Sequence, residues 1–168
     1  RSEQTAFLSK LAHEKVVSDK FWKHIKTLKD EKNFEKLNEV DKNVVKRLYL
    51  DVEKSRKIPS SFVEKIAKAT TLSYQAWEKA REKNDFKVFE KNLKEIIELE
   101  KEYCSYIDLP GPRYNTLLDD YEEGMTANIL KKEFSYLKKE LKRMIERIKG
   151  SNVYQNQWVP IMACWRAY

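Results

Sequence analysis

The sequence predicts an all-α fold, a bundle of about five to six long helices with short connections and one Pro/Gly loop at 108–114. The 168-residue chain contains only three Gly and four Pro, and Lys and Glu dominate it, which favours long helices. Charged residues make up 36% of the chain, well above the usual quarter, as expected for solvated helix faces. Apolar residues recur at helical spacing, and no stretch shows the period-two alternation of a sheet.

Residues that start or stop helices divide the first half of the chain. Ser18 and Asp19 interrupt the first apolar pattern, which predicts a bend between two helical segments. Ser61 and Glu64 have the spacing of a capping box, in which each side chain bonds a backbone N–H of the first turn. Pro59 disfavours helical geometry in the residue before it. The expected elements are a bent segment over 3–28, a connection at 33–38, a helix capped by Asp41 that ends near 58, and a helix from 61 to about 83.

The second half contains one clear loop and a last long helix. The stretch DLPGPRY, residues 108–114, is the loop, because Pro and Gly fix its turns. Gly124 permits a positive φ, Thr126 is a suitable helix cap, and Gly150 is a natural stop. The other expected helices are 86–103, after a break at Asn84 and Asp85, and 115–121. The side of the last helix expected to be buried holds Ile129, Leu130, Phe134, Leu137, Leu141, Met144, Ile145 and Ile148.

Charge and composition exclude several classes of protein. The net charge of +7 is spread among acidic residues almost everywhere, whereas a nucleic-acid surface would gather basic residues on one face, so no nucleic-acid partner is expected. No apolar run is long enough for a membrane span, and no signal peptide or membrane association is expected. Two cysteines, Cys104 and Cys164, are too few for a disulfide framework, which predicts a cytoplasmic protein.

The stretch HEKVV, residues 13–17, resembles an incomplete zinc-protease motif. H-E-x-x-H places two imidazoles one helical turn apart, but Val17 stands where the second would be. The two histidines, His13 and His24, are eleven residues apart, near opposite sides of one straight helix. Zinc requires at least three protein ligands even in an open site. We therefore expect neither a catalytic residue nor a metal ligand here, and both cysteines are interpreted as packing residues.

The last eighteen residues differ in character from the rest of the chain. The segment 151–168 carries a single charge, and a freely solvated tail of this content would promote aggregation. It is expected to pack on the helices, to swap between chains, or to form a homodimer or protein-partner contact, since Trp and Tyr are favoured at binding hot spots. The candidate contact residues are Tyr154, Trp158, Ile161, Met162, Trp165 and Tyr168.

Three stretches of the chain resemble the N-terminal half of the carboxypeptidase Taq family, over about residues 1–150. They are SEQTAFLSKLAHEKVVSD, the stretch from IPSSFVEKIAKATT to IIELEKE, and the stretch from YNTLLDDYEEG to KRMIERI. The most specific elements are Y-x-x-L-L-D-x-Y-E-x-G and W-x-x-A-R-x-x-x-D-F. The residues that carry them are Tyr114, Leu117, Leu118, Asp119, Tyr121, Glu122 and Gly124, and Trp77, Ala80, Arg81, Asp85 and Phe86.

The resemblance implies a zinc metallocarboxypeptidase that releases C-terminal amino acids from peptides. It also offers an interpretation of the HEKVV stretch. In that family a His-Glu or His-Gln pair occurs in the first helices, and His13 and Glu14 match it. The zinc-binding H-E-x-x-H lies in the second half of a chain about three times as long, and it is missing here. The resemblance therefore implies a helical part that walls the substrate groove, inactive alone, with no cofactor of its own. The segment 151–168 is unlike the family, and is interpreted as engineered, selected, out of frame or naturally divergent.

The family motif residues are expected to support architecture, with no catalytic role carried over. Tyr114, Leu117 and Leu118 should anchor the loop on the bundle. The carboxylate pairs on either side of Tyr121 flank a turn before Gly124, where they are expected to cap and solvate the chain. The alternative function is a binding or assembly module, natural or engineered, that uses the aromatic tail as its contact surface.

Overall fold

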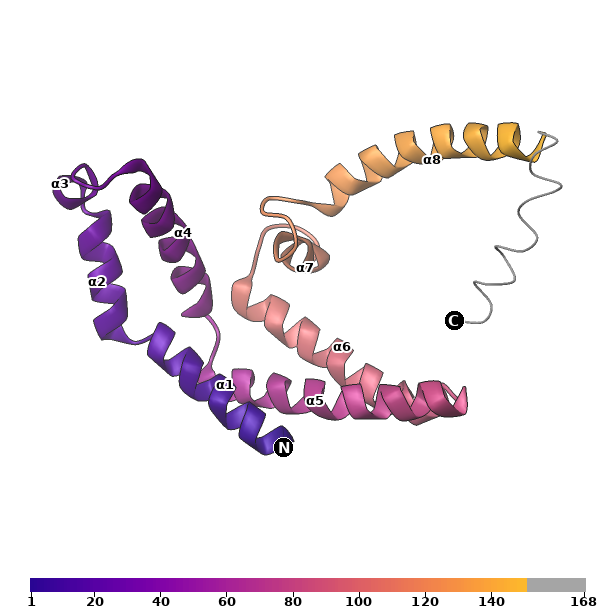
Figure 1. The fold of residues 1–168 in the computed structure, drawn as a ribbon, viewed down its shortest axis with the longest axis horizontal. Coiled ribbons are helices and arrows are strands. Elements are labelled where there is room, and N and C mark those ends of the chain that lie inside the picture. Colours follow the sequence, from indigo (N-terminus) through magenta and orange to yellow (C-terminus); the bar gives the residue numbers. More distant parts are fainter. Residues whose placement is uncertain (151–168) are drawn as a thin grey trace. The chain divides into compact units, whose positions relative to one another are not determined.

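The computed structural model describes residues 1–150, and in this range it is all-α, with eight helices and no strand. This confirms the predicted fold class, and six of the helices have seven or more residues. The chain divides into two compact units, one covering Arg1–Thr116 and the other beginning at Leu117. The helices are α1 (Ser2–Val16), α2 (Asp19–Lys29), α3 (Glu31–Phe34), α4 (Glu39–Ser55), α5 (Ser60–Lys83), α6 (Lys87–Ile107), α7 (Tyr114–Asp119) and α8 (Ala127–Lys149) (Figure 1).

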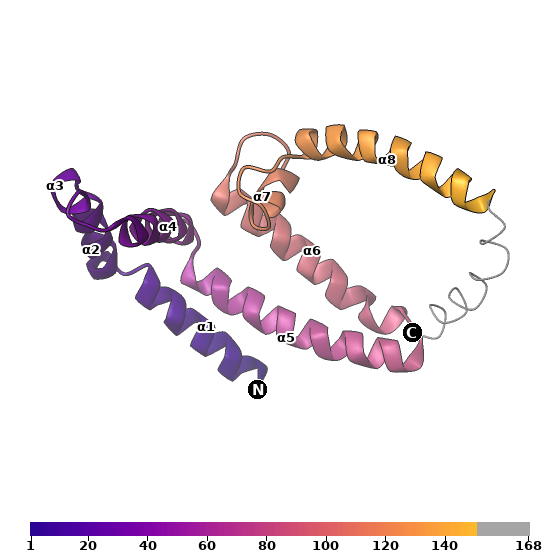
Figure 2. The same ribbon diagram turned by 45° about the horizontal axis from the view of Figure 1, so that its top comes forward.

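The centre of the first unit is the packing of α5 against α1 on one side and against α6 on the other (Figure 2). The α5–α6 core is built on Phe62, Ala69 and Leu99, each at most 4% exposed. The Tyr106 ring meets the Phe62 ring edge-on at a centroid separation of 5.2 Å. Ala69 has the smallest side chain of the three, and a small side chain on a contact face lets two helices pack closely.

A second pair of helices, α2 and α4, packs side by side, with the short α3 between them in sequence. The Trp22 and Tyr49 rings face each other across this pair, with centroids 4.8 Å apart. The sequence predicted a plain connection at 33–38, but its first residues complete α3. The cap of α4 is Asn38 and not Asp41, because the Asn38 Oδ1 accepts the Asp41 backbone N–H at 2.8 Å.

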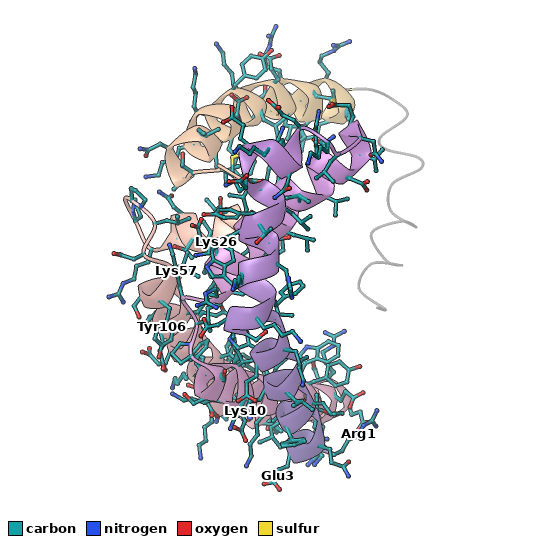
Figure 3. All side chains as sticks on the ribbon, turned by 90° about the vertical axis from the view of Figure 1, so that its left-hand side faces the viewer. Arg1, Glu3, Lys10, Lys26, Lys57 and Tyr106 are labelled. Carbon is teal, nitrogen blue, oxygen red and sulfur yellow. The ribbon has the colours of Figure 1, made fainter. Side chains whose placement is uncertain are left out.

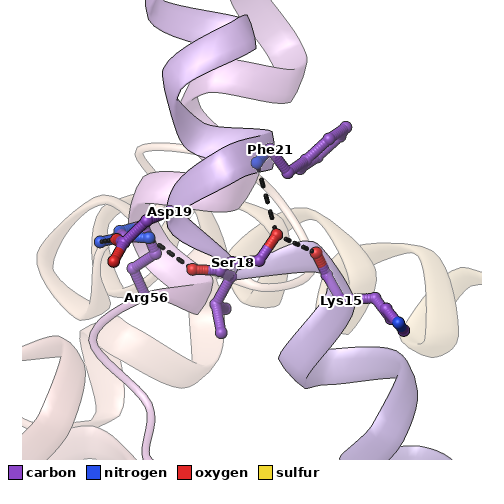
Figure 4. Close-up of polar contacts among 6 residues, drawn as sticks. Lys15, Ser18, Asp19, Phe21 and Arg56 are labelled. Atoms are coloured by element: carbon purple, nitrogen blue, oxygen red, sulfur yellow. Dashed lines mark hydrogen bonds and ion pairs between the residues drawn. The ribbon is translucent and has the colours of Figure 1, made fainter.

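The predicted bend at Ser18 and Asp19 is confirmed and is held by polar contacts (Figure 4). The Ser18 hydroxyl donates to the Lys15 carbonyl at 2.8 Å, and its oxygen accepts the Phe21 N–H at 3.4 Å. From α4's end, the Arg56 guanidinium donates to the Val17 carbonyl and pairs with Asp19 at 2.8 Å. The bend is therefore fixed both by a local cap and by an arginine from a distant part of the chain.

The predicted capping box at the start of α5 is wrong. The helix begins at Ser60 after Pro59, and no side chain caps it. The Glu64 carboxylate instead pairs with the Lys10 ammonium of α1 at 2.8 Å, and Glu3 pairs with Lys68 at 3.0 Å. Glu3 and Lys10 are labelled in Figure 3. An ion pair between helices thus replaces the local hydrogen bond that the sequence pattern suggested.

The start of α8 agrees with prediction, but its environment does not. Thr126 caps the helix, since its Oγ1 accepts the Ile129 N–H at 3.3 Å, and Gly150 follows its last turn. None of the residues of α8 is buried, although eight apolar side chains were expected on a buried side. No helix within residues 1–150 is both long and apolar enough to cross a membrane.

Candidate functional site

The His13 imidazole of the HEKVV stretch lies half-buried on α1 and contacts the chain just before Pro59. Its Nε2 is 2.9 Å from the Ile58 carbonyl oxygen. Because a carbonyl only accepts hydrogen bonds, Nε2 carries the proton and donates it, which leaves only Nδ1 with a lone pair. Glu14 is exposed. His13 therefore links α1 to the α4–α5 connection.

The part of the chain that the structure describes does not fit a zinc centre. His24 lies exposed on α2, and within residues 1–150 no three His, Cys, Asp or Glu side chains gather closely enough to hold a metal ion. Zinc sites in proteins require three or four such ligands. Cys104 is a free thiol buried in α6, and Cys164 lies outside the described residues. The described residues thus hold no group of side chains suited to metal-assisted hydrolysis.

Substituting His13→Ala is expected to lower the free energy of unfolding by about 1 kcal/mol. The variant leaves the half-buried Ile58 carbonyl without its donor, and a typical hydrogen bond contributes about that amount. Urea denaturation measures the effect. His24→Ala, at an exposed histidine, is the matched control and should change stability by less than about 0.5 kcal/mol. Equal effects of the two substitutions would contradict the assigned role of His13.

The W-x-x-A-R-x-x-x-D-F motif begins on α5, beside a groove between α1 and α5. The Trp77 ring is 44% exposed and stands 5.8 Å from the Tyr74 ring, and Arg81 is exposed one turn further on. Tyr74 lines the groove, whose volume is about 500 Å³. The other lining residues are Arg1, Thr5, Thr70, Thr71, Gln75 and Glu78. The groove is walled mainly by hydroxyl groups and a few charges, without a nucleophile–base pair.

The Y-x-x-L-L-D-x-Y-E-x-G motif runs through α7 and the turn that follows it. The Gly124 N–H donates to the Asp119 carboxylate at 2.9 Å, and Gly124 has φ +80°, a conformation in which a side chain would be strained. Asp119 therefore closes the turn, as expected of a capping carboxylate. Tyr121 is 94% exposed, and Leu117 and Leu118 are half-buried.

The expectation that Tyr114 anchors the loop is wrong, since its side chain is 58% exposed. The neighbouring polar residues Asn115 and Thr116 are buried instead. The Asn115 amide donates to the Pro110 carbonyl at 3.1 Å and so ties α7 back to the Pro/Gly loop. Neither residue was predicted from the sequence, although an Asn next to a loop of this kind is a common source of side-chain-to-backbone hydrogen bonds.

A carboxylate with a lowered pKa joins α5 to α6. The Lys65 ammonium donates to Glu102 at 2.8 Å, and the Tyr106 hydroxyl donates to the same carboxylate at 3.0 Å. These hydrogen bonds, that of Lys65 first, hold the pKa of Glu102 below its ordinary value. The stability that they contribute is present above the unfolded-state pKa of about 4.3 and is lost as the pH falls through the lower folded-state pKa.

Substituting Glu102→Gln is therefore expected to flatten the loss of stability on acidification between about pH 5 and pH 3. Urea denaturation midpoints measured across that range for the variant and the unsubstituted chain test this. Lys65→Met removes the main partner of the carboxylate and should flatten the profile as well. A profile unchanged in both variants would contradict the assignment.

The proposed tail contacts fall on residues that the structure does not describe. Tyr154, Trp158, Ile161, Met162, Trp165 and Tyr168 all lie beyond residue 150. Their contact role stays a prediction, as does the distinct character of segment 151–168.

Comparison with known families gives a match over almost the whole chain. The profile of the family described as Carboxypeptidase Taq (M32) metallopeptidase matches residues 1–164, a range that runs past residue 150. Thermostable carboxypeptidase 1 of Pyrococcus furiosus is 34% identical over 148 residues, which cover 88% of this chain and 29% of that protein. Thermostable carboxypeptidase 1 of Thermus thermophilus is 30% identical over 161 residues, which cover 90% of this chain and 31% of that protein.

Solved structures resemble the chain to a similar extent. The crystal structure of BsuCP superimposes with a TM-score of 0.84 at 27% identity, covering 90% of this chain and 30% of that one. A Pyrococcus furiosus carboxypeptidase structure gives a TM-score of 0.74 at 33% identity, covering 83% of this chain and 28% of that one. The chain thus spans about three-tenths of the length of the relatives that it matches.

Proposed function

The chain belongs to the carboxypeptidase Taq (M32) metallopeptidase family, and we propose that it supplies part of the helical wall around the peptide groove of such an enzyme. In this proposal the complete protein releases C-terminal amino acids from peptides with the help of zinc. The 168-residue chain contributes architecture and does not hydrolyse peptides alone.

One observation carries the statement that the chain does not hydrolyse peptides alone, and it concerns the His13 imidazole of the HEKVV stretch. The His13 Nε2 donates to the Ile58 carbonyl, and in the described residues no set of ligand side chains surrounds either histidine. Contacts within the stretch that carries the Y-x-x-L-L-D-x-Y-E-x-G motif support the statement that the chain contributes architecture. Asp119 closes a turn on Gly124, Asn115 fastens the Pro/Gly loop, and both are contacts that shape a scaffold.

The experiment is a peptidase assay of the 168-residue chain with added zinc. A synthetic peptide is incubated with the chain, and mass spectrometry follows the release of its C-terminal residue. No zinc-dependent release is expected. Release that disappears in a His13→Ala/His24→Ala variant would overturn the proposal, because it would assign a working metal site to these imidazoles.

A second candidate function is that of a binding or assembly module that uses the tail. The apolar and aromatic content of segment 151–168 supports it, since such residues dominate binding hot spots. Deleting residues 152–168 should then abolish partner binding or self-association in pull-down and sedimentation experiments. A truncated chain that keeps both would contradict this candidate.

The proposal also places the protein in the reducing cytoplasm. Only two cysteines are present in the sequence, and Cys104 is a buried free thiol. Proteins of oxidising compartments commonly use their cysteines in disulfides.

A further inference from the structure

We draw no further inference here: the strongest candidate, the exposed apolar face of α8 that holds Phe134, Leu137, Leu141 and Met144, carries nothing because nothing in the structure shows what covers it in a chain that spans about three-tenths of its relatives' length.

Discussion

Substituting Phe62→Ala is expected to lower the free energy of unfolding by about 3–5 kcal/mol. The Phe62 ring is 3% exposed, packs among Ala69 and Leu99, and meets Tyr106 edge-on. Its removal takes away the transfer free energy of a full aromatic side chain and leaves a cavity between α5 and α6, which those helices fill only in part. Chemical denaturation followed by circular dichroism measures the change.

The control for this prediction is Phe7→Ala on α1, where the ring is 60% exposed. That substitution should cost less than about 0.5 kcal/mol. Because a loss of 3–5 kcal/mol is a large part of the stability of a typical domain, the alanine variant can fail to fold. Phe62→Leu keeps most of the volume and should cost clearly less. A leucine variant as damaging as the alanine variant, or a Phe7→Ala effect of the same size, would contradict the assignment of Phe62 to the core.

Substituting Ser73→Ala is expected to raise the free energy of unfolding by about 1–2 kcal/mol. In the described residues the Ser73 hydroxyl is buried, with the residue 6% exposed, and has no hydrogen-bond partner. A buried hydroxyl without a partner loses its hydration and receives nothing in exchange. Alanine removes that hydroxyl and is also the best helix former, at a position inside α5.

The matched control is Ser61→Ala, which removes an exposed hydroxyl from the first turn of the same helix. Its effect on the urea midpoint should be small. If Ser73→Ala instead lowers the midpoint, a bound water satisfies the hydroxyl, and the expected gain is absent.

The sequence predicted the helices well because their boundaries depend on local chemistry. The bend at Ser18, the cap by Thr126 and the positive φ of Gly124 need only the nearest residues, and all three are confirmed. The capping box at Ser61 failed because the helix begins one residue earlier, at Ser60, and because Glu64 meets Lys10, which lies more than fifty residues away in the chain. A tertiary ion pair of this kind has no signal in the local pattern.

The candidate site was less predictable than the fold. A His-Glu pair on a helix is compatible both with a metal site and with a structural role. The structural role is favoured because, within residues 1–150, no further ligand side chains gather near His13, whose imidazole donates to the Ile58 carbonyl. The apolar face of α8 was correctly assigned to a helix, but hydrophobic periodicity does not say what covers that face. Asn115 and Thr116 were missed because polar residues are expected to be exposed.

The contacts at residues 56–58 have a consequence for local opening of the first unit. Arg56 holds Val17 and Asp19, and the Ile58 carbonyl accepts from His13, so the α1–α2 bend and the α4–α5 connection are joined at one place. The connection cannot move away from the end of α1 without breaking these hydrogen bonds. In native-state hydrogen–deuterium exchange, the amides on both sides of this junction should therefore open as one cooperative group, with a common free energy of opening.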